Sequence, residues 1–90
     1  MALNRSFLFA PGNHPRRVEK AFTLGADAVI LDLEDAVALS EKAASRKPVA
    51  EAVAREGKAR PRVRAYVRVN AMGTPFCFRD LVDTVVPGLY

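Results

Sequence analysis

The sequence predicts an α/β fold in which short parallel strands alternate with helices. Apolar runs of strand length start at Ser6, Ala28 and Arg64, and segments of helix length separate them. The connections between successive strands are long enough for the crossovers that parallel pairing requires. The expected order along the chain is therefore β-α-β-α-β-α.

The first unit is a strand over Ser6–Ala10 followed by a helix from about His14 to Leu24. Between them stand Pro11 and Gly12, a dipeptide typical of turns. Pro15 falls in the first helical turn, where its missing N–H group costs nothing. The pattern therefore predicts a strand, a tight turn and a helix.

Two arginines, Arg16 and Arg17, stand near the start of this helix. Cations at that end oppose the helix dipole, so they are not there to stabilise the helix. An anion held by helix N–H groups and these side chains would explain them. Solvated surface charge is the alternative interpretation.

The second strand, Ala28–Leu33, is an apolar run that leads into three carboxylates, Asp32, Glu34 and Asp35. Because strand side chains alternate, Asp32 and Glu34 share one face, and purely apolar side chains occupy the other. This pattern predicts a parallel strand with its apolar face under helices and its acidic end at an active-site mouth. The alternative is that the acids cap the following loop and helix.

A second helix is expected from Ser40 to about Arg55, with Gly57 as its end. Pro48 falls inside it, and an interior proline breaks or kinks a helix. We therefore expect a bend there or a fresh start at about Lys47.

The third strand, Arg64–Asn70, alternates cleanly and places Arg68 and Asn70 on the same face. A third helix is expected from about Phe78 to Val86. Its apolar residues are predicted to point inward: Leu81, Val82 and Val85.

Arg68 and Asn70 end the third strand on the side where Asp32 and Glu34 end the second. Arginine is the side chain best suited to bidentate recognition of a carboxylate, so Arg68 is a candidate for binding an acidic substrate. A salt bridge from Arg68 to Glu34 or Asp35 is the alternative, because a buried charge needs a partner. The two roles can coexist.

The composition is that of one globular domain covering residues 1–90. Half of the residues are hydrophobic and 27% are charged, which argues against disorder. The net charge of +4 suits anionic ligands but is not the dense basic surface of a nucleic-acid-binding protein. No apolar run reaches the length of a membrane span, so we expect neither nucleic acid nor membrane as a partner. A single cysteine, Cys77, and the lack of a signal-peptide pattern predict a cytoplasmic protein.

The predicted set of elements is incomplete as a domain. Three parallel strands of this kind need cover on both faces and leave two bare edges. Leu89 and Tyr90 look like the first step of a fourth strand. We therefore expect the chain to be a truncated portion of a (β/α)8 TIM barrel.

Three motifs stand out along the chain: R-S-F-L-F-A-P-G-N near the start, V-I-L-D-L-E-D-A-V in the second strand and V-R-V-N in the third. In this order and spacing they resemble the CitE-like (citrate lyase beta subunit) group of the HpcH/HpaI aldolase/citrate lyase family. The resemblance extends from Arg5 to about Leu89. It implies a phosphoenolpyruvate/pyruvate-type TIM barrel, of which this chain is the N-terminal third. It also implies C–C bond cleavage or formation in citryl-, malyl- or methylmalyl-CoA thioesters.

The resemblance implies roles for particular residues. Arg68 corresponds to the arginine that binds the substrate carboxylate, and Glu34 and Asp35 lie in the acidic motif beside it, so we expect these three to be catalytic. Asn70 and Asp32 are expected to join Arg68 in binding the substrate. The coenzyme A moiety would approach a group near the start of the first helix: Pro11, Gly12, Arg16 and Arg17.

The resemblance further implies Mg²⁺, which polarises the oxygens of the oxo or hydroxy acid while the thioester fragment becomes an enolate. The family's metal-binding Glu and Asp would lie beyond Tyr90, so no metal ligand is expected in this chain. The 90-residue chain alone is therefore expected to be inactive. The intact protein is expected to be a homo-oligomer or a subunit of a multi-subunit lyase, with a small-molecule acyl-thioester as its partner.

Two other functions fit the same residues. One is a metal-dependent aldolase acting on free hydroxy-oxo acids, which would not need the cationic start of the first helix. The other is a non-catalytic truncated chain that only self-associates through its exposed strands.

Overall fold

The structure is a computed structural model that describes residues 6–34 and 37–90, and its centre is a parallel sheet with the strand order β1-β2-β3. The strands are β1 (Phe7–Pro11), β2 (Ala28–Asp32) and β3 (Arg64–Arg68). The register places Pro11, Asp32 and Arg68 side by side at the carboxyl edge of the sheet. The predicted parallel α/β arrangement is confirmed.

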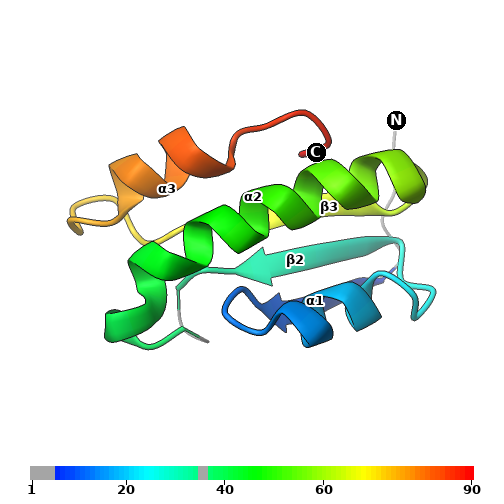
Figure 1. The fold of residues 1–90 in the computed structure, drawn as a ribbon, viewed down its shortest axis with the longest axis horizontal. Coiled ribbons are helices and arrows are strands. Elements are labelled where there is room, and N and C mark those ends of the chain that lie inside the picture. Colours follow the sequence, from blue (N-terminus) through cyan, green and yellow to red (C-terminus); the bar gives the residue numbers. More distant parts are fainter. Residues whose placement is uncertain (1–5, 35–36) are drawn as a thin grey trace.

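Three helices lie on one side of this sheet, with α2 running across β2 and β3 (Figure 1). They are α1 (Pro15–Ala21), α2 (Lys42–Ala59) and α3 (Cys77–Thr84), and the short 3₁₀ turn η1 (Leu39–Glu41) precedes α2. Pro15 begins α1, as predicted. The helix is shorter than expected, because it ends at Ala21 and not at Leu24.

The hydrophobic core lies between the sheet and helices α1 and α2. Val29, Leu31 and Leu33 point into it and are fully buried. Burying an aliphatic side chain of this size contributes roughly 1.5–3 kcal/mol relative to leaving it exposed. The helical side of the core is formed mainly by Val18, Phe22, Val49 and Val53. The prediction that the apolar face of the second strand lies under helices is confirmed.

The other side of the sheet carries no helix in the described part of the chain. We call it the open face, and its large apolar and aromatic side chains are Phe7, Phe9, Ile30, Tyr66 and Tyr90. The ring centroids of Phe7 and Tyr66 lie 6.0 Å apart, and those of Tyr66 and Tyr90 lie 5.3 Å apart. Aromatic side chains therefore cluster on a largely solvent-exposed sheet surface.

Helix α2 is continuous through Pro48, so the predicted fresh start at Lys47 is wrong. An interior proline costs about 3 kcal/mol, and the packing of neighbouring apolar residues of α2 into the core outweighs that cost. The predicted end at Gly57 is also wrong, since the helix continues to Ala59. Gly57 instead allows a close approach, because a Cβ atom there would lie 2.7 Å from the Cα atom of Gly88.

Helix α3 packs with the face opposite to the one predicted. The side chains expected inside are exposed, Leu81 by 48%, whereas Asp80 and Thr84 are buried. Asp80 finds polar partners on α2 and at the end of β3, which makes its burial possible. The helix also starts at Cys77 and ends at Thr84, one and two residues earlier than expected.

The predicted first step of a fourth strand is present as a single parallel bridge between Leu89 and Ala65. The backbone N–H of Tyr90 donates to the carbonyl of Ala65 at 2.8 Å. No helix in the described ranges is long and apolar enough to cross a membrane.

Candidate functional site

The carboxyl edge of the sheet brings Arg68 and Asp32 together. Arg68 donates from Nε to Oδ1 of Asp32 at 3.0 Å and from Nη2 to Oδ2 at 2.6 Å. This bidentate arrangement is the strong form of an arginine–carboxylate pair. Asp32 is buried, while 38% of the Arg68 side chain stays exposed. Asp32 therefore fixes the orientation of a guanidinium group that still reaches solvent.

An aromatic ring from β1 adds a second restraint on Arg68. The guanidinium carbon lies 5.3 Å from the ring centroid of Phe9, within the range of a cation–π contact. The sequence reasoning did not single out Phe9. Strand alternation could have found it, because Phe9 shares a face of the sheet with the arginine in a parallel register.

Glu34 is a more distant neighbour of Arg68 than expected. Its Oε1 lies 3.9 Å from Nε of Arg68, an ion-pair contact beyond hydrogen-bond distance. The nearer partner is Asp32, because Asp32 pairs in register with Arg68, whereas Glu34 follows the end of β2. The backbone N–H of Glu34 donates to Oδ1 of Asp32 at 2.8 Å. Asp35, the other predicted acid, lies outside the described residues.

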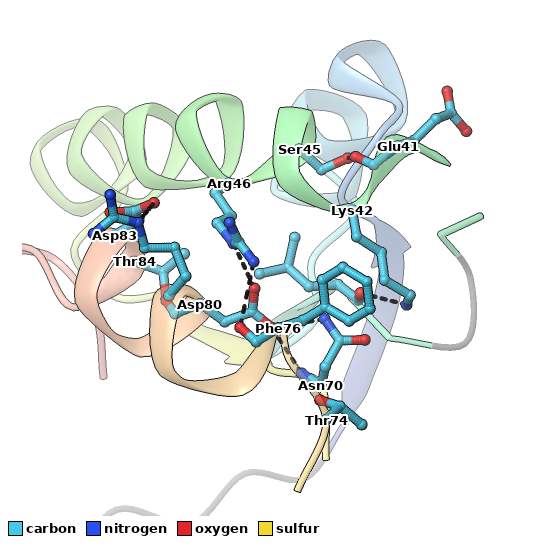
Figure 2. A network of polar contacts seen from close by, with 12 residues as sticks. Glu41, Lys42, Ser45, Arg46, Asn70, Thr74, Phe76, Asp80, Asp83 and Thr84 are labelled. Atoms are coloured by element: carbon cyan, nitrogen blue, oxygen red, sulfur yellow. Dashed lines mark hydrogen bonds and ion pairs between the residues drawn. The ribbon is translucent and has the colours of Figure 1, made fainter. Parts of the chain in front are cut away.

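Asn70 is buried and is held by a residue that the sequence reasoning missed, Asp80. Its backbone N–H and its side-chain Nδ2 donate to Oδ2 of Asp80 at 2.9 and 2.6 Å. Arg46 of α2 donates from Nε to the other oxygen of Asp80 at 2.7 Å, so Asp80 lies between Asn70 and Arg46 (Figure 2). These contacts commit the amide donor of Asn70 to the protein. The predicted role of Asn70 in substrate binding stays a prediction.

Burial by itself would raise the pKa of Asp80. The hydrogen bonds from Arg46 and Asn70 and the charge of Arg46 outweigh burial, so the pKa lies below its usual value. Asp80 is therefore a buried carboxylate that stays ionised at neutral pH. Its sequence signal was weak, because an Asp beside Leu81 and Val82 looks like the polar face of an amphipathic helix.

A buried lysine, Lys42, holds the chain where β2 ends. Its Nζ donates to the carbonyl oxygens of Leu33 at 3.1 Å and of Glu34 at 2.7 Å. Nζ also lies 5.9 Å from the ring centroid of Phe76. Lys42 therefore fixes the backbone at the start of the acidic segment, a role that sequence position alone did not indicate.

The four residues predicted to approach coenzyme A do not gather at one place. Pro11 and Arg17 line a hollow of about 330 Å³, together with Lys20. Gly12 lies between α1 and α2, and its N–H donates to the carbonyl of Asp32 at 2.8 Å. Arg16 is exposed. Of the predicted cations, Arg17 is the one that lines this hollow, where Lys20 adds a second positive charge.

Two buried carboxylates of the described residues, Asp32 and Asp80, are taken up by hydrogen bonds within the protein. Within residues 6–34 and 37–90, no three His, Cys, Asp or Glu side chains are grouped so that they could hold a metal ion. Both oxygens of Asp32 accept from Arg68, and both oxygens of Asp80 accept from Arg46 or Asn70. These two carboxylates serve as hydrogen-bond acceptors for the protein.

The model of the HpcH/HpaI aldolase/citrate lyase family matches residues 5–90. The chain belongs to this family. An L-malyl-CoA/beta-methylmalyl-CoA lyase of Cereibacter sphaeroides is 44% identical over 80 residues, which are 89% of this chain and 24% of that protein. This HpcH/HpaI chain thus spans about a quarter of the length of that relative.

Solved structures of the family show the same fold. The Mycobacterium tuberculosis citrate lyase beta subunit, complexed with oxaloacetate and magnesium, has a TM-score of 0.72 and 40% identity. The similarity covers 91% of this chain and 34% of that one. CitE of the same organism, in complex with magnesium, acetoacetate and coenzyme A, has a TM-score of 0.70 and 38% identity over 90% of this chain and 29% of that one. The resemblance to the CitE-like group of HpcH/HpaI proteins is confirmed.

Proposed function

We propose that this chain supplies the carboxylate-binding side of a C–C lyase that acts on coenzyme A thioesters of hydroxy acids. The observation that carries the proposal is the bidentate Asp32–Arg68 pair at the carboxyl edge of a parallel sheet. That edge is where the active sites of barrel enzymes of this type lie. In this proposal the chain is a single domain, the N-terminal third of a TIM barrel, and is inactive by itself.

The chemistry assigned to Arg68 is charge stabilisation. When the C–C bond of the hydroxyacyl thioester breaks, the hydroxyl group gives its proton to a base of the whole enzyme and its carbon becomes the carbonyl of an oxo acid. The bonding electrons pass to the thioester fragment as an enolate, which then takes up a proton. The guanidinium of Arg68 binds the carboxylate of the oxo-acid portion and holds it in a fixed plane. Asp32 orients Arg68 and Glu34 lies beside it, while Asp35 keeps the catalytic role that the resemblance implies.

Magnesium and coenzyme A enter this proposal from the relatives. The solved family structures hold magnesium with oxaloacetate, or magnesium with acetoacetate and coenzyme A. We assign the ligands of the metal to residues beyond Tyr90, as the resemblance to the family implies. For the thioester, Pro11, Arg17 and Lys20 offer a cationic hollow of suitable sign. We further propose that the whole protein is cytoplasmic and oligomeric.

The proposal is tested by replacing Arg68 with lysine in the natural polypeptide of the source cells. Lysine keeps the charge but loses the bidentate geometry, so kcat/KM for malyl-CoA or citryl-CoA should fall by about 10- to 100-fold. Arg79→Lys, at an exposed position of α3, is the control and should leave kcat/KM for the same thioester unchanged. Full activity of the Arg68→Lys enzyme would contradict the assignment.

A second substitution separates thioesters from free acids as substrates. Arg17→Ala removes a cation from the hollow beside Pro11, so KM for the thioester should rise while turnover of a free hydroxy-oxo acid stays unchanged. Conversion of free acids only, insensitive to Arg17, would favour the aldolase function. If the protein converts neither thioesters nor free acids and oxaloacetate does not stabilise it, the non-catalytic chain is favoured.

A further inference from the structure

A buried ion pair outside the predicted site links α2, α3 and the end of β3. Asp80 on α3 has a side chain with 0% exposure and accepts from Arg46 on one oxygen and from Asn70 on the other. Arg46 also donates from Nη2 to the carbonyl of Phe76 at 3.3 Å. Figure 2 shows these side chains converging from three segments of the chain. We call Arg46 and Asp80 the buried clamp.

Stability alone does not explain the clamp. The desolvation of two charges offsets most of their attraction, and well-packed apolar residues often replace such a pair with no loss of stability. The apolar residues of α3, among them Leu81, meanwhile face solvent. A helix that turns its charged residue inward and its leucine outward gains a defined position relative to its partners, because hydrogen bonds are directional.

The buried clamp fixes the position of the end of β3. Asn70 follows Arg68 by two residues, and its backbone N–H is bound by Asp80. On the other side, the backbone N–H of Leu33 donates to the carbonyl of Arg68 at 2.9 Å. The segment that carries Arg68 is therefore fixed by β2 through Leu33 and by α3 through Asp80.

We propose that Arg46 and Asp80 are positioning residues that fix the end of β3 and so hold Arg68 in the orientation set by its pair with Asp32. Neither residue contacts a ligand in this scheme. The substrate part of the inference rests on the proposed function, whereas the geometric part concerns this chain only. A loosened clamp leaves the sheet intact but allows the 68–70 segment to move.

The test compares Asp80→Asn with Asp83→Asn. Asn at position 80 keeps the shape but turns one acceptor into a donor, so it loses either Arg46 or Asn70 as a partner. Asp83 lies on the same helix, and its contact with Arg79 is exposed and 3.9 Å long, which makes Asp83→Asn a matched control. Both variants are labelled with ¹⁵N for amide hydrogen exchange and for the Nε–H resonance of Arg68.

In Asp80→Asn, exchange of the Asn70 amide should accelerate at least tenfold relative to the amides of Val29 and Leu31 in the core. The Nε–H resonance of Arg68 should shift or broaden. Asp83→Asn should change neither. Equal acceleration at all these amides, or an unaltered Arg68 resonance, would overturn the proposal, because the clamp would then be a general structural contact.

Oxaloacetate with magnesium serves as the ligand probe in the intact polypeptide. Its Kd should rise at least tenfold in Asp80→Asn and be unchanged in Asp83→Asn. An unchanged Kd in Asp80→Asn would overturn the link to the site. If the unsubstituted protein does not bind oxaloacetate, the proposed function fails, and the Arg68 resonance still decides the positioning role. Should Asp80→Asn not fold, Arg46→Lys, which keeps the charge but removes the bond to Phe76, undergoes the same measurements with the same expected direction.

Discussion

Five charged side chains of the described residues are buried, namely Asp32, Lys42, Arg46, Glu56 and Asp80, and each has a charged or hydrogen-bonding partner. Asp80 and Arg46 satisfy each other, while Lys42 donates to two backbone carbonyls. A buried charge without such partners would be prohibitively costly. Arg68 differs from these five, because more than a third of its side chain remains in contact with solvent while Asp32 orients it. The buried charged groups thus hold the structure in place, whereas Arg68 can contact a ligand.

Acid should weaken the fold through Asp80. Its pKa is lower in the folded chain than in the unfolded chain, where it is about 3.9. A depressed pKa contributes stability that is present above the unfolded value and is lost as the pH falls through the folded value. We therefore expect the free energy of unfolding, measured with urea, to decrease below about pH 4. Asp80→Asn should lower stability at pH 7 and flatten this decrease, while Asp83→Asn should keep the unsubstituted slope. Equal slopes in all three proteins would contradict the prediction.

Replacing Lys42 by methionine tests the anchor at the end of β2. Methionine has a similar length but cannot donate, so the carbonyls of Leu33 and Glu34 lose a buried partner. Stability should fall by about 1–3 kcal/mol in urea unfolding. Lys47→Met, at an exposed position of the same helix, should change it by less than about 0.5 kcal/mol. A loss of the same size at both positions would show that the buried hydrogen bonds are not its cause.

Among the secondary-structure elements, α2 contacts the sheet, α3 and the segment that follows α3. It buries Val49 and Val53 against the sheet, holds α3 through Arg46, and meets the segment after α3 at Gly57. The last contact is between backbones, since a Cβ atom added at Gly57 would lie 2.7 Å from Gly88. The spacing between α2 and the chain end is therefore set by the absence of a side chain.

Gly57→Ala should reverse the usual effect of this substitution. In an exposed helix interior, alanine is more favourable than glycine by about 1 kcal/mol. Here the added methyl group meets the backbone of Gly88, so we expect a loss of roughly 1–3 kcal/mol and a lower Tm. Lys58→Ala, at the next, exposed position, is the control and should be nearly neutral. A more stable Gly57→Ala chain would mean that the segment at Gly88 moves away without cost.

The elements also show what the sequence could and could not predict. Strand positions followed from apolar runs and alternation: β1 is shifted by one residue from its predicted range, and β2 and β3 end one and two residues earlier than predicted. The facing of α3 could not be read from its amphipathic pattern, because the pattern defines two faces but not which one is covered. The partner of Asp80 is Arg46, 34 positions away in sequence. Such long-range pairs depend on how helices pack, which local periodicity does not encode.

At the scale of the whole molecule, the described structure is two layers, a sheet and the helices on one side of it (Figure 1). In the TIM-barrel proposal the open face is turned toward the barrel interior, and the other strands of the proposed barrel would close around it. Membership in the HpcH/HpaI family and the quarter-length match to a malyl-CoA lyase support that proposal. The candidate Arg68 site lies at the edge of this face, so its environment depends on whatever closes the sheet.

The placement of the tyrosines has a spectroscopic consequence. The chain contains no tryptophan and two tyrosines, so its ultraviolet emission arises from Tyr66 and Tyr90, which are in contact on the open face. Tyr90 is 64% exposed, so acrylamide should quench the folded chain strongly and Tyr90→Phe should remove most of that quenching. Unchanged quenching in Tyr90→Phe would contradict this assignment. The intrinsic fluorescence of this protein therefore monitors the bare side of the sheet, and the packed side beneath the helices emits no signal of its own.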